Sequence, residues 1–72
     1  MKFHYYPETD SLYIDLSERT SVESEEVRPG VVLDVDAEGR LVGIHIDRAS
    51  EAVDLSRLEV EALPMTSVSL AR

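Results

Sequence analysis

Residues 31–47, with the sequence VVLDVDAEGRLVGIHID, decide the fold. On both sides of a short polar segment, apolar side chains recur at every second position, a period that predicts β-strands with one buried face. The polar segment, residues 36–39, fits a type I turn in which Gly39 is left-handed. We therefore predict the central hairpin of a sheet. Its inward-facing side chains are Val31, Leu33, Val35, Val42, Ile44 and Ile46.

Gly43 lies on the other face of the return strand, between Leu41 and His45. A glycine inside a strand indicates a bulge or the close approach of another group.

Toward the N-terminus, the sequence predicts a second hairpin. Residues 2–6 are rich in aromatic side chains and end at Pro7, which favours a strand. Residues 7–10 then form a turn, because proline pre-sets the backbone at its second position. Beyond the turn the period of two returns, and one face of the second strand is apolar. Its side chains are Leu12, Ile14 and Leu16.

Residues 22–28, between the hairpins, predict a weaker strand. Their two apolar side chains, Val22 and Val27, would lie on opposite faces, and a bulge near Glu25 and Glu26 would reconcile them. Together with Glu23, these glutamates indicate a charged edge strand, which resists pairing with other edges.

After residue 47 the pattern changes. Ser50 is placed to cap a helix over residues 50–57, and residues 58–63 then alternate as a last strand before Pro64. A longer helical stripe through residue 62 remains an alternative. Residues 65–72 read as a tail, with Val68 and Leu70 as a marginal strand. The predicted fold class is α+β and β-rich: a small antiparallel meander of about five strands with a short C-terminal helix, in a single domain over residues 1–72.

Composition limits the classes of partner that this protein is expected to bind. Seven basic and fifteen acidic residues give a net charge of −8, which disfavours nucleic acid and anionic membranes. No apolar run reaches the length of a membrane span and no signal peptide is evident, so we expect a cytoplasmic protein. A chain of 72 residues buries a thin core and the absence of cysteine excludes disulfides, so we expect a homodimer.

The turn of the central hairpin resembles the start of a calcium loop. Asp34, Asp36 and Glu38 place oxygen ligands at alternate positions and Gly39 follows them. The twelfth position is His45 rather than the required glutamate, and strands rather than helices flank the loop. We therefore predict no metal and no cofactor, with Asp34, Asp36, Glu38 and His45 as the only metal ligands worth testing.

A small hydrolase or metal-dependent enzyme is the alternative function. It would use His45 with Asp34 or Asp36, and His45 and Asp34 would meet across the hairpin. Against it, no serine is placed as a nucleophile and no glycine-rich loop offers an anion cradle. We therefore predict no catalytic residue.

Four side chains are candidates for binding a protein partner. Tyr13 has the parity of the face away from the core, where an aromatic side chain either anchors an interface or packs across strands. Glu23, Glu25 and Glu26 form the other candidate, an acidic patch for a basic protein, against the simpler interpretation of a solvated face.

The pattern resembles the domain of unknown function 2283 family of small bacterial proteins, over about residues 3–50. The resemblance rests on Tyr5, Pro7, Glu8, Asp10, residues 12–14, 16–17, 23–27, 30–31, 33–34, Asp36, Gly39 and residues 42–44. Tyr6 departs from it, because the family usually has an aspartate before the proline. The resemblance implies a compact β-rich domain and no particular activity. Small proteins of this kind suggest an antitoxin-like or regulatory partner of a basic protein. A non-enzymatic protein-binding module is therefore the expected function.

Overall fold

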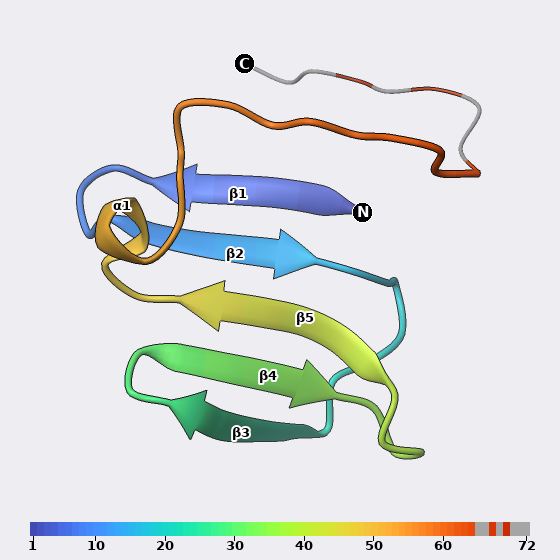
Figure 1. The fold of residues 1–72 in the computed structure, drawn as a ribbon. Helices are drawn as coiled ribbons and strands as arrows, with labels where there is room; N and C mark the ends of the chain where they lie inside the picture. The colour runs from blue at the N-terminus through green and yellow to red at the C-terminus, as the bar shows by residue number, and fades with distance from the viewer. Residues whose placement is uncertain (65–66, 68, 70–72) are drawn as a thin grey trace.

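The computed structural model describes residues 1–64, 67 and 69. They form one five-stranded antiparallel sheet and a single one-turn helix (Figure 1). The elements are β1 (Lys2–Tyr6), β2 (Ser11–Asp15), β3 (Glu23–Arg28), β4 (Val31–Val35), β5 (Leu41–Ile46) and α1 (Ala49–Ala52). The predicted class, a β-rich antiparallel sheet with a short C-terminal helix, is confirmed. None of the described helices is long and apolar enough to cross a membrane.

The strand order in the sheet is β1-β2-β5-β4-β3. Two hairpin-linked units, β1–β2 and β3–β4–β5, are joined by antiparallel pairing of β2 with β5. The loop after β2 therefore carries the chain to the far edge, where β3 begins, and β5 becomes the central strand (Figure 1). The edges are β1 and β3.

Cross-strand register separates the two faces of the sheet, because directly paired residues point to the same side. One row runs from Phe3 through Ile14, Ile44 and Leu33 to Glu25. We call the side that carries this row the apolar face. Its other apolar strand residues are Tyr5, Leu12, Ile46 and Val31. The opposite side, the polar face, carries His4, Tyr13, His45, Asp34 and Ser24.

The core lies on the apolar face and is small. Leu12, Ile46 and Ala49 are its buried cluster, with Ile14 and Ile44 packed against them. As predicted, Val42 is also buried. Among the described residues, no large side chain is fully buried. The chain after α1 runs on along the β1 side of the sheet (Figure 1). Its residues 53–55, 57 and 58 border a hollow on the apolar face together with Phe3, Leu12, Ile14 and Ile46.

Two strands of the sheet contain an irregularity in their pairing, and both refine what the sequence predicts. The bulge in β3 falls between Glu26 and Arg28, one step beyond the predicted position. A second irregularity separates the Asp34–Gly43 pair from the Val35–Leu41 pair, so that Val42 is the extra residue of β5. The glycine signal in this strand thus coincides with a bulge.

The C-terminal prediction was wrong in two respects. The helix is a single turn over Ala49–Ala52, and residues 58–63 form no strand. Val53 already has extended dihedral angles, and the Asp54 carboxylate accepts hydrogen bonds from the Ser56 backbone and hydroxyl. Such local bonds compete with helical ones, which explains the early end. The predicted tail lies outside the described residues, apart from 67 and 69.

Ser50 does not cap the helix as predicted, because it lies inside the turn. Its backbone N–H and hydroxyl donate to the Asp10 carboxylate, at 3.1 and 2.6 Å, and the Ala49 N–H donates to the Asp10 carbonyl. The cap therefore comes from the β1–β2 turn, forty residues earlier in the chain. The bond from the Ser50 hydroxyl, followed by one from the Tyr5 hydroxyl, lowers the pKa of Asp10.

Candidate functional site

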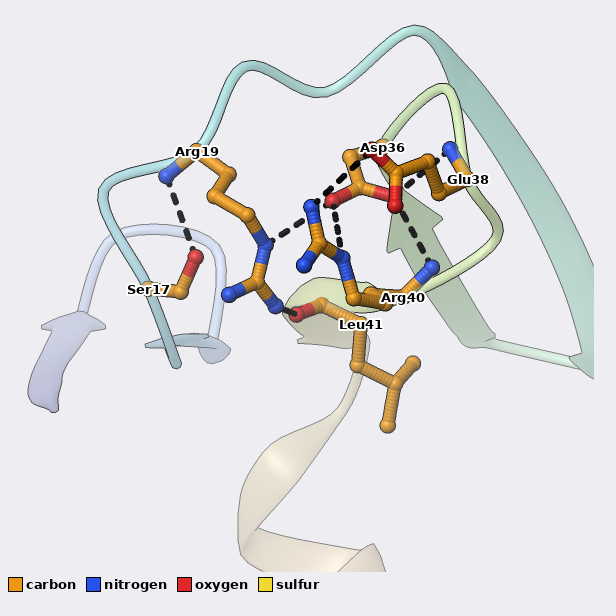
Figure 2. Close-up of polar contacts among 6 residues, drawn as sticks. All are labelled: Ser17, Arg19, Asp36, Glu38, Arg40 and Leu41. Atoms are coloured by element: carbon orange, nitrogen blue, oxygen red, sulfur yellow. Dashed lines mark hydrogen bonds and ion pairs between the residues drawn. The ribbon is translucent and has the colours of Figure 1, made fainter.

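The most organised polar cluster surrounds Asp36, in the turn between β4 and β5 (Figure 2). One carboxylate oxygen, Oδ1, accepts the backbone N–H groups of Glu38 and Arg40, each at 2.9 Å. The other, Oδ2, is 3.0 Å from Arg40 Nε. The side chain is only 8% exposed. Asp36 thus organises its own turn, as an aspartate at the first position of such a turn does.

Arg19 brings a second guanidinium to the same carboxylate from the loop between β2 and β3. Its Nε lies 2.8 Å from Asp36 Oδ2, and its Nη2 donates to the Leu41 carbonyl at 3.0 Å (Figure 2). The backbone N–H of Arg19 donates to Ser17 Oγ, which fixes the loop itself. The cluster therefore fastens the loop that crosses the sheet to the turn of the central hairpin.

The electrostatics of this cluster show what the Asp36 carboxylate of the calcium-like motif binds in the fold. The backbone N–H of Arg40 is the largest cause that holds the pKa of Asp36 below its usual value, with the Glu38 N–H and the Arg40 side chain adding to it against the effect of burial. Two guanidinium groups occupy the place where a cation would bind. Asp34 and His45 lie in strands, on the polar face of the sheet. The four metal-ligand candidates, Asp34, Asp36, Glu38 and His45, do not converge on one point, and no cluster of three or more such side chains occurs in the described residues.

A second arrangement crosses the polar face. The Tyr13 hydroxyl donates to Asp34 Oδ2 at 3.0 Å, and Ser24 Oγ donates to Asp34 Oδ1 at 2.7 Å. To reach Asp34, the Tyr13 side chain passes over Gly43: a Cβ atom at Gly43 would lie 2.5 Å from Tyr13 Cζ and closer still to the hydroxyl oxygen. Burial, followed by the bond to Asp34, raises the pKa of Tyr13. The close approach expected at Gly43 is therefore the Tyr13 ring.

This arrangement bears on the two hypotheses for Tyr13. Its hydroxyl and ring are both engaged within the sheet, which is the cross-strand packing alternative. The side chain is still partly exposed. Its role as a partner anchor stays a prediction.

His45 does not meet Asp34. In the register of β4 and β5, His45 is paired with Val32 and Asp34 with Gly43, so the two side chains lie in neighbouring rows. His45 Nε2 is instead 2.8 Å from Asp47 Oδ1, two residues further along the chain. The predicted contact between His45 and Asp34 across the hairpin, which the enzyme hypothesis required, is therefore wrong. The sequence pattern correctly placed both residues on one face of the sheet, but it did not determine which residues of β4 and β5 are paired.

The His45–Asp47 pair borders a shallow, open hollow at the end of the polar face. Tyr6 and Ser11 line the same hollow. Ser11 is buried, and its hydroxyl points to the Thr9 carbonyl at 3.5 Å. The geometry thus brings a histidine and a carboxylate together but gives the histidine no hydroxyl contact of the kind that activates a serine nucleophile.

The three glutamates of the predicted acidic patch lie on β3, at one edge of the sheet (Figure 1). All six residues of β3 are exposed. Glu23 and Glu25 are paired with Val35 and Leu33 and share the apolar face with them, whereas Glu26 is paired with Val32 on the polar face. Within the described part of the chain, none of the three forms a salt bridge.

Sequence reasoning missed the roles of Arg19, Arg40 and Asp10. A signal for Arg19 was present, since it is the one basic residue in the acidic run between residues 10 and 26. Nothing local pointed to its partner seventeen residues away. Asp10 was assigned to a turn, and its contact with α1 arises only from the pairing of β2 with β5.

Comparison with known proteins gives one match. A protein-family model described as a protein of unknown function, DUF2283, matches residues 2–50. Searches of curated proteins and of solved structures each returned no match. The matched segment contains all five strands, the Asp36 cluster and the Tyr13–Gly43–Asp34 arrangement. Because the model covers more than half of the chain, this protein belongs to the DUF2283 family of proteins of unknown function.

Proposed function

We propose that this protein is a bacterial, cytoplasmic, non-enzymatic binding module that holds a basic segment of another protein along the edge strand β3, as an antitoxin-like or regulatory partner would. The supporting observation is the state of β3. It is an edge strand whose outer backbone groups have no neighbouring strand among the described residues, and it carries three glutamates with no cation in salt-bridge distance there.

β3 carries one cation of its own, Arg28 at its end, which forms no salt bridge within the described part of the chain. Arg19 and Arg40 are both held on Asp36, so they do not neutralise the edge. Of the 22 charged residues, fifteen are acidic, and the excess adds a favourable long-range field for a basic partner. An extended peptide can add to an exposed edge through backbone hydrogen bonds, while its side chains supply selectivity.

The charges on β3 determine which kinds of strand can pair with this edge. Antiparallel pairing of two β3 strands in the centred register would bring Glu25 opposite Glu26, which is unfavourable, although Glu23 would face Arg28; a strand that carries several lysines or arginines would bring opposite charges together along its whole length. Glu25 and Glu26 thus oppose self-association at this edge, and all three glutamates favour a basic strand. Glu23 and Glu25 project from one face of the strand and Glu26 from the other, so both sides of an added strand would meet a carboxylate.

The test is a nuclear magnetic resonance titration with a peptide of alternating lysine and valine. We expect amide shifts concentrated at Glu23–Arg28, and weaker binding as salt is added. Replacing the three glutamates together, as Glu23→Gln, Glu25→Gln and Glu26→Gln, should weaken binding ~10-fold, since each exposed pair contributes a few tenths of a kcal/mol or more.

The matched control changes the net charge equally at exposed positions elsewhere. It combines Glu8→Gln, Glu18→Gln and Glu51→Gln. This triple variant should lose far less affinity than the β3 triple. Equal losses would show that the peptide responds only to overall charge, and the absence of any shift along β3 would reject the proposal.

The hydrolase alternative required a contact between His45 and Asp34 or Asp36, but His45 pairs with Asp47 instead. No observation favours it over a binding role.

A further inference from the structure

We infer that the apolar face of the sheet is the interface for a second copy of this chain, so that two sheets stack face to face. This surface meets the β3 edge only at its margin, at Glu23 and Glu25, and the inference does not depend on the proposed function. The supporting observations are the incomplete cover of the apolar face, the total exposed area and the distribution of charge at its margins.

The apolar face is only partly covered. In β1, Phe3 is 50% exposed and Tyr5 45% exposed, although both belong to the same face as the buried Leu12 and Ile46. Val31 and Leu33 of β4 are partly buried rather than buried. The side chains that follow α1 do not close the gap, since Val53 and Leu55 are themselves about two-fifths exposed.

The amount of exposed surface fits a missing partner layer. The chain exposes 6039 Å², whereas a folded monomer of its mass is expected to expose ~4,500 Å². Part of the excess comes from the extended residues after α1. The difference is therefore only an upper limit on the area that a partner layer would cover, to be set against the ~1,000–2,500 Å² that each protomer of an obligate dimer buries.

A second copy is the natural occupant because it would supply what the sheet lacks. An apolar sheet face is stable when another layer covers it, and two antiparallel sheets pack ~10 Å apart with their inner faces interdigitated. The apolar face extends across β1, β2, β5 and β4, and a two-fold axis can place the part that α1 and the chain after it leave open against the same part of a second copy. The chain is acidic overall, yet the described rows at the centre of this face carry no charge: Tyr5–Leu12–Ile46–Val31 and Phe3–Ile14–Ile44–Leu33.

Charge at the margins selects the orientation. Glu23 and Glu25 lie at the β3 margin of the apolar face. Arg57 borders the hollow at the β1 margin together with Asp54, and its Nη2 is 3.0 Å from Glu59 Oε1, so charges of both signs lie at that margin. A two-fold axis along the strands places the β3 margin of one copy over the β1 margin of the other, which brings Glu25 toward the partner's Arg57. An axis across the strands would place glutamates over glutamates. The first arrangement is therefore the one we infer.

The experiment compares two matched variants of the full chain by sedimentation equilibrium over a range of concentrations. Phe3→Lys changes the apolar face, and Tyr6→Lys changes the polar face of the same strand at nearly the same exposure, 50% against 48%. We expect the parent and Tyr6→Lys to sediment at twice the 8.1 kDa chain mass. Phe3→Lys should dissociate at least ~10-fold more readily.

Several outcomes would overturn the inference: a parent protein that stays monomeric at high micromolar concentration, or a dimer that Tyr6→Lys disrupts and Phe3→Lys does not. If Phe3→Lys fails to fold, isotope-filtered contacts in the parent decide instead. Methyl groups of Ile44 and Leu33 should then show contacts between copies, and contacts confined to the polar face or to an edge would reject the stacked arrangement. A monomeric Phe3→Lys should still bind the basic peptide at β3, so the two proposals fail separately.

Discussion

At the scale of single residues, Gly43 and Tyr13 make one unit. The Tyr13 ring occupies the space that a side chain at Gly43 would need, and its hydroxyl reaches Asp34 across that gap. In a strand, alanine is ordinarily favoured over glycine by roughly 0.5–1 kcal/mol. Here the clash with the ring reverses the sign, because forcing a methyl group into a filled position costs about 1–3 kcal/mol.

We therefore predict that Gly43→Ala lowers the melting temperature by ~5–15 °C, followed by circular dichroism. The control is the same change in a Tyr13→Ala background, where the ring is absent. There the alanine should cost little or add stability. If Gly43→Ala costs the same in both backgrounds, the two residues are not coupled and the bulge alone requires the glycine.

At the scale of elements, the Asp36 cluster fastens the β2–β3 loop to the β4–β5 turn, and its strength depends on pH. Hydrogen bonds, the Arg40 N–H first among them, lower the pKa of Asp36 in the folded protein below the usual 3.8. A group with a lowered folded pKa stabilises the fold above its unfolded pKa, and this contribution disappears as the pH falls through the folded value. The loop attachment should therefore weaken in acid.

We predict that Asp36→Asn lowers the melting temperature by ~10 °C at pH 7, and that the gap to the parent closes as the pH falls from about 5 to 2. Melting curves across this range measure it. Glu8→Gln, an exposed change outside the cluster, is the control and should leave a small gap at every pH. A gap for Asp36→Asn that stays constant down to pH 2 would mean that its charge plays no part.

The elements also show how far sequence reasoning reaches. The strands were predictable because their signals are local: alternation in residues 31–47, and turn residues such as Pro7 and Gly39. A short helix after β5 was predicted too, but its bounds and its cap were not, because the cap comes from Asp10 and the end from Asp54, and helical periodicity carries neither signal. Likewise, the contact of Arg19 with Asp36 joins two loops that are distant in the sequence, so no local signal predicted it. Local pattern predicts elements, while the pairing of β2 with β5 decides which distant side chains meet.

At the scale of the whole molecule, a single sheet with a thin core and one incompletely covered face gains most from a second layer. The orientation of that layer is testable by charge. If Glu25 of one copy lies near the partner's Arg57, then Glu25→Arg and Arg57→Glu should each weaken the dimer by ~2–5-fold, as expected for exposed ion pairs. The double variant, which exchanges the two charges, should recover most of the loss, as measured by sedimentation equilibrium at low salt. With the other axis, Glu25→Arg would replace one like-charge contact by another and Arg57→Glu would not compensate it. Additive losses in the double variant would therefore contradict the stacked orientation while leaving the dimer itself intact.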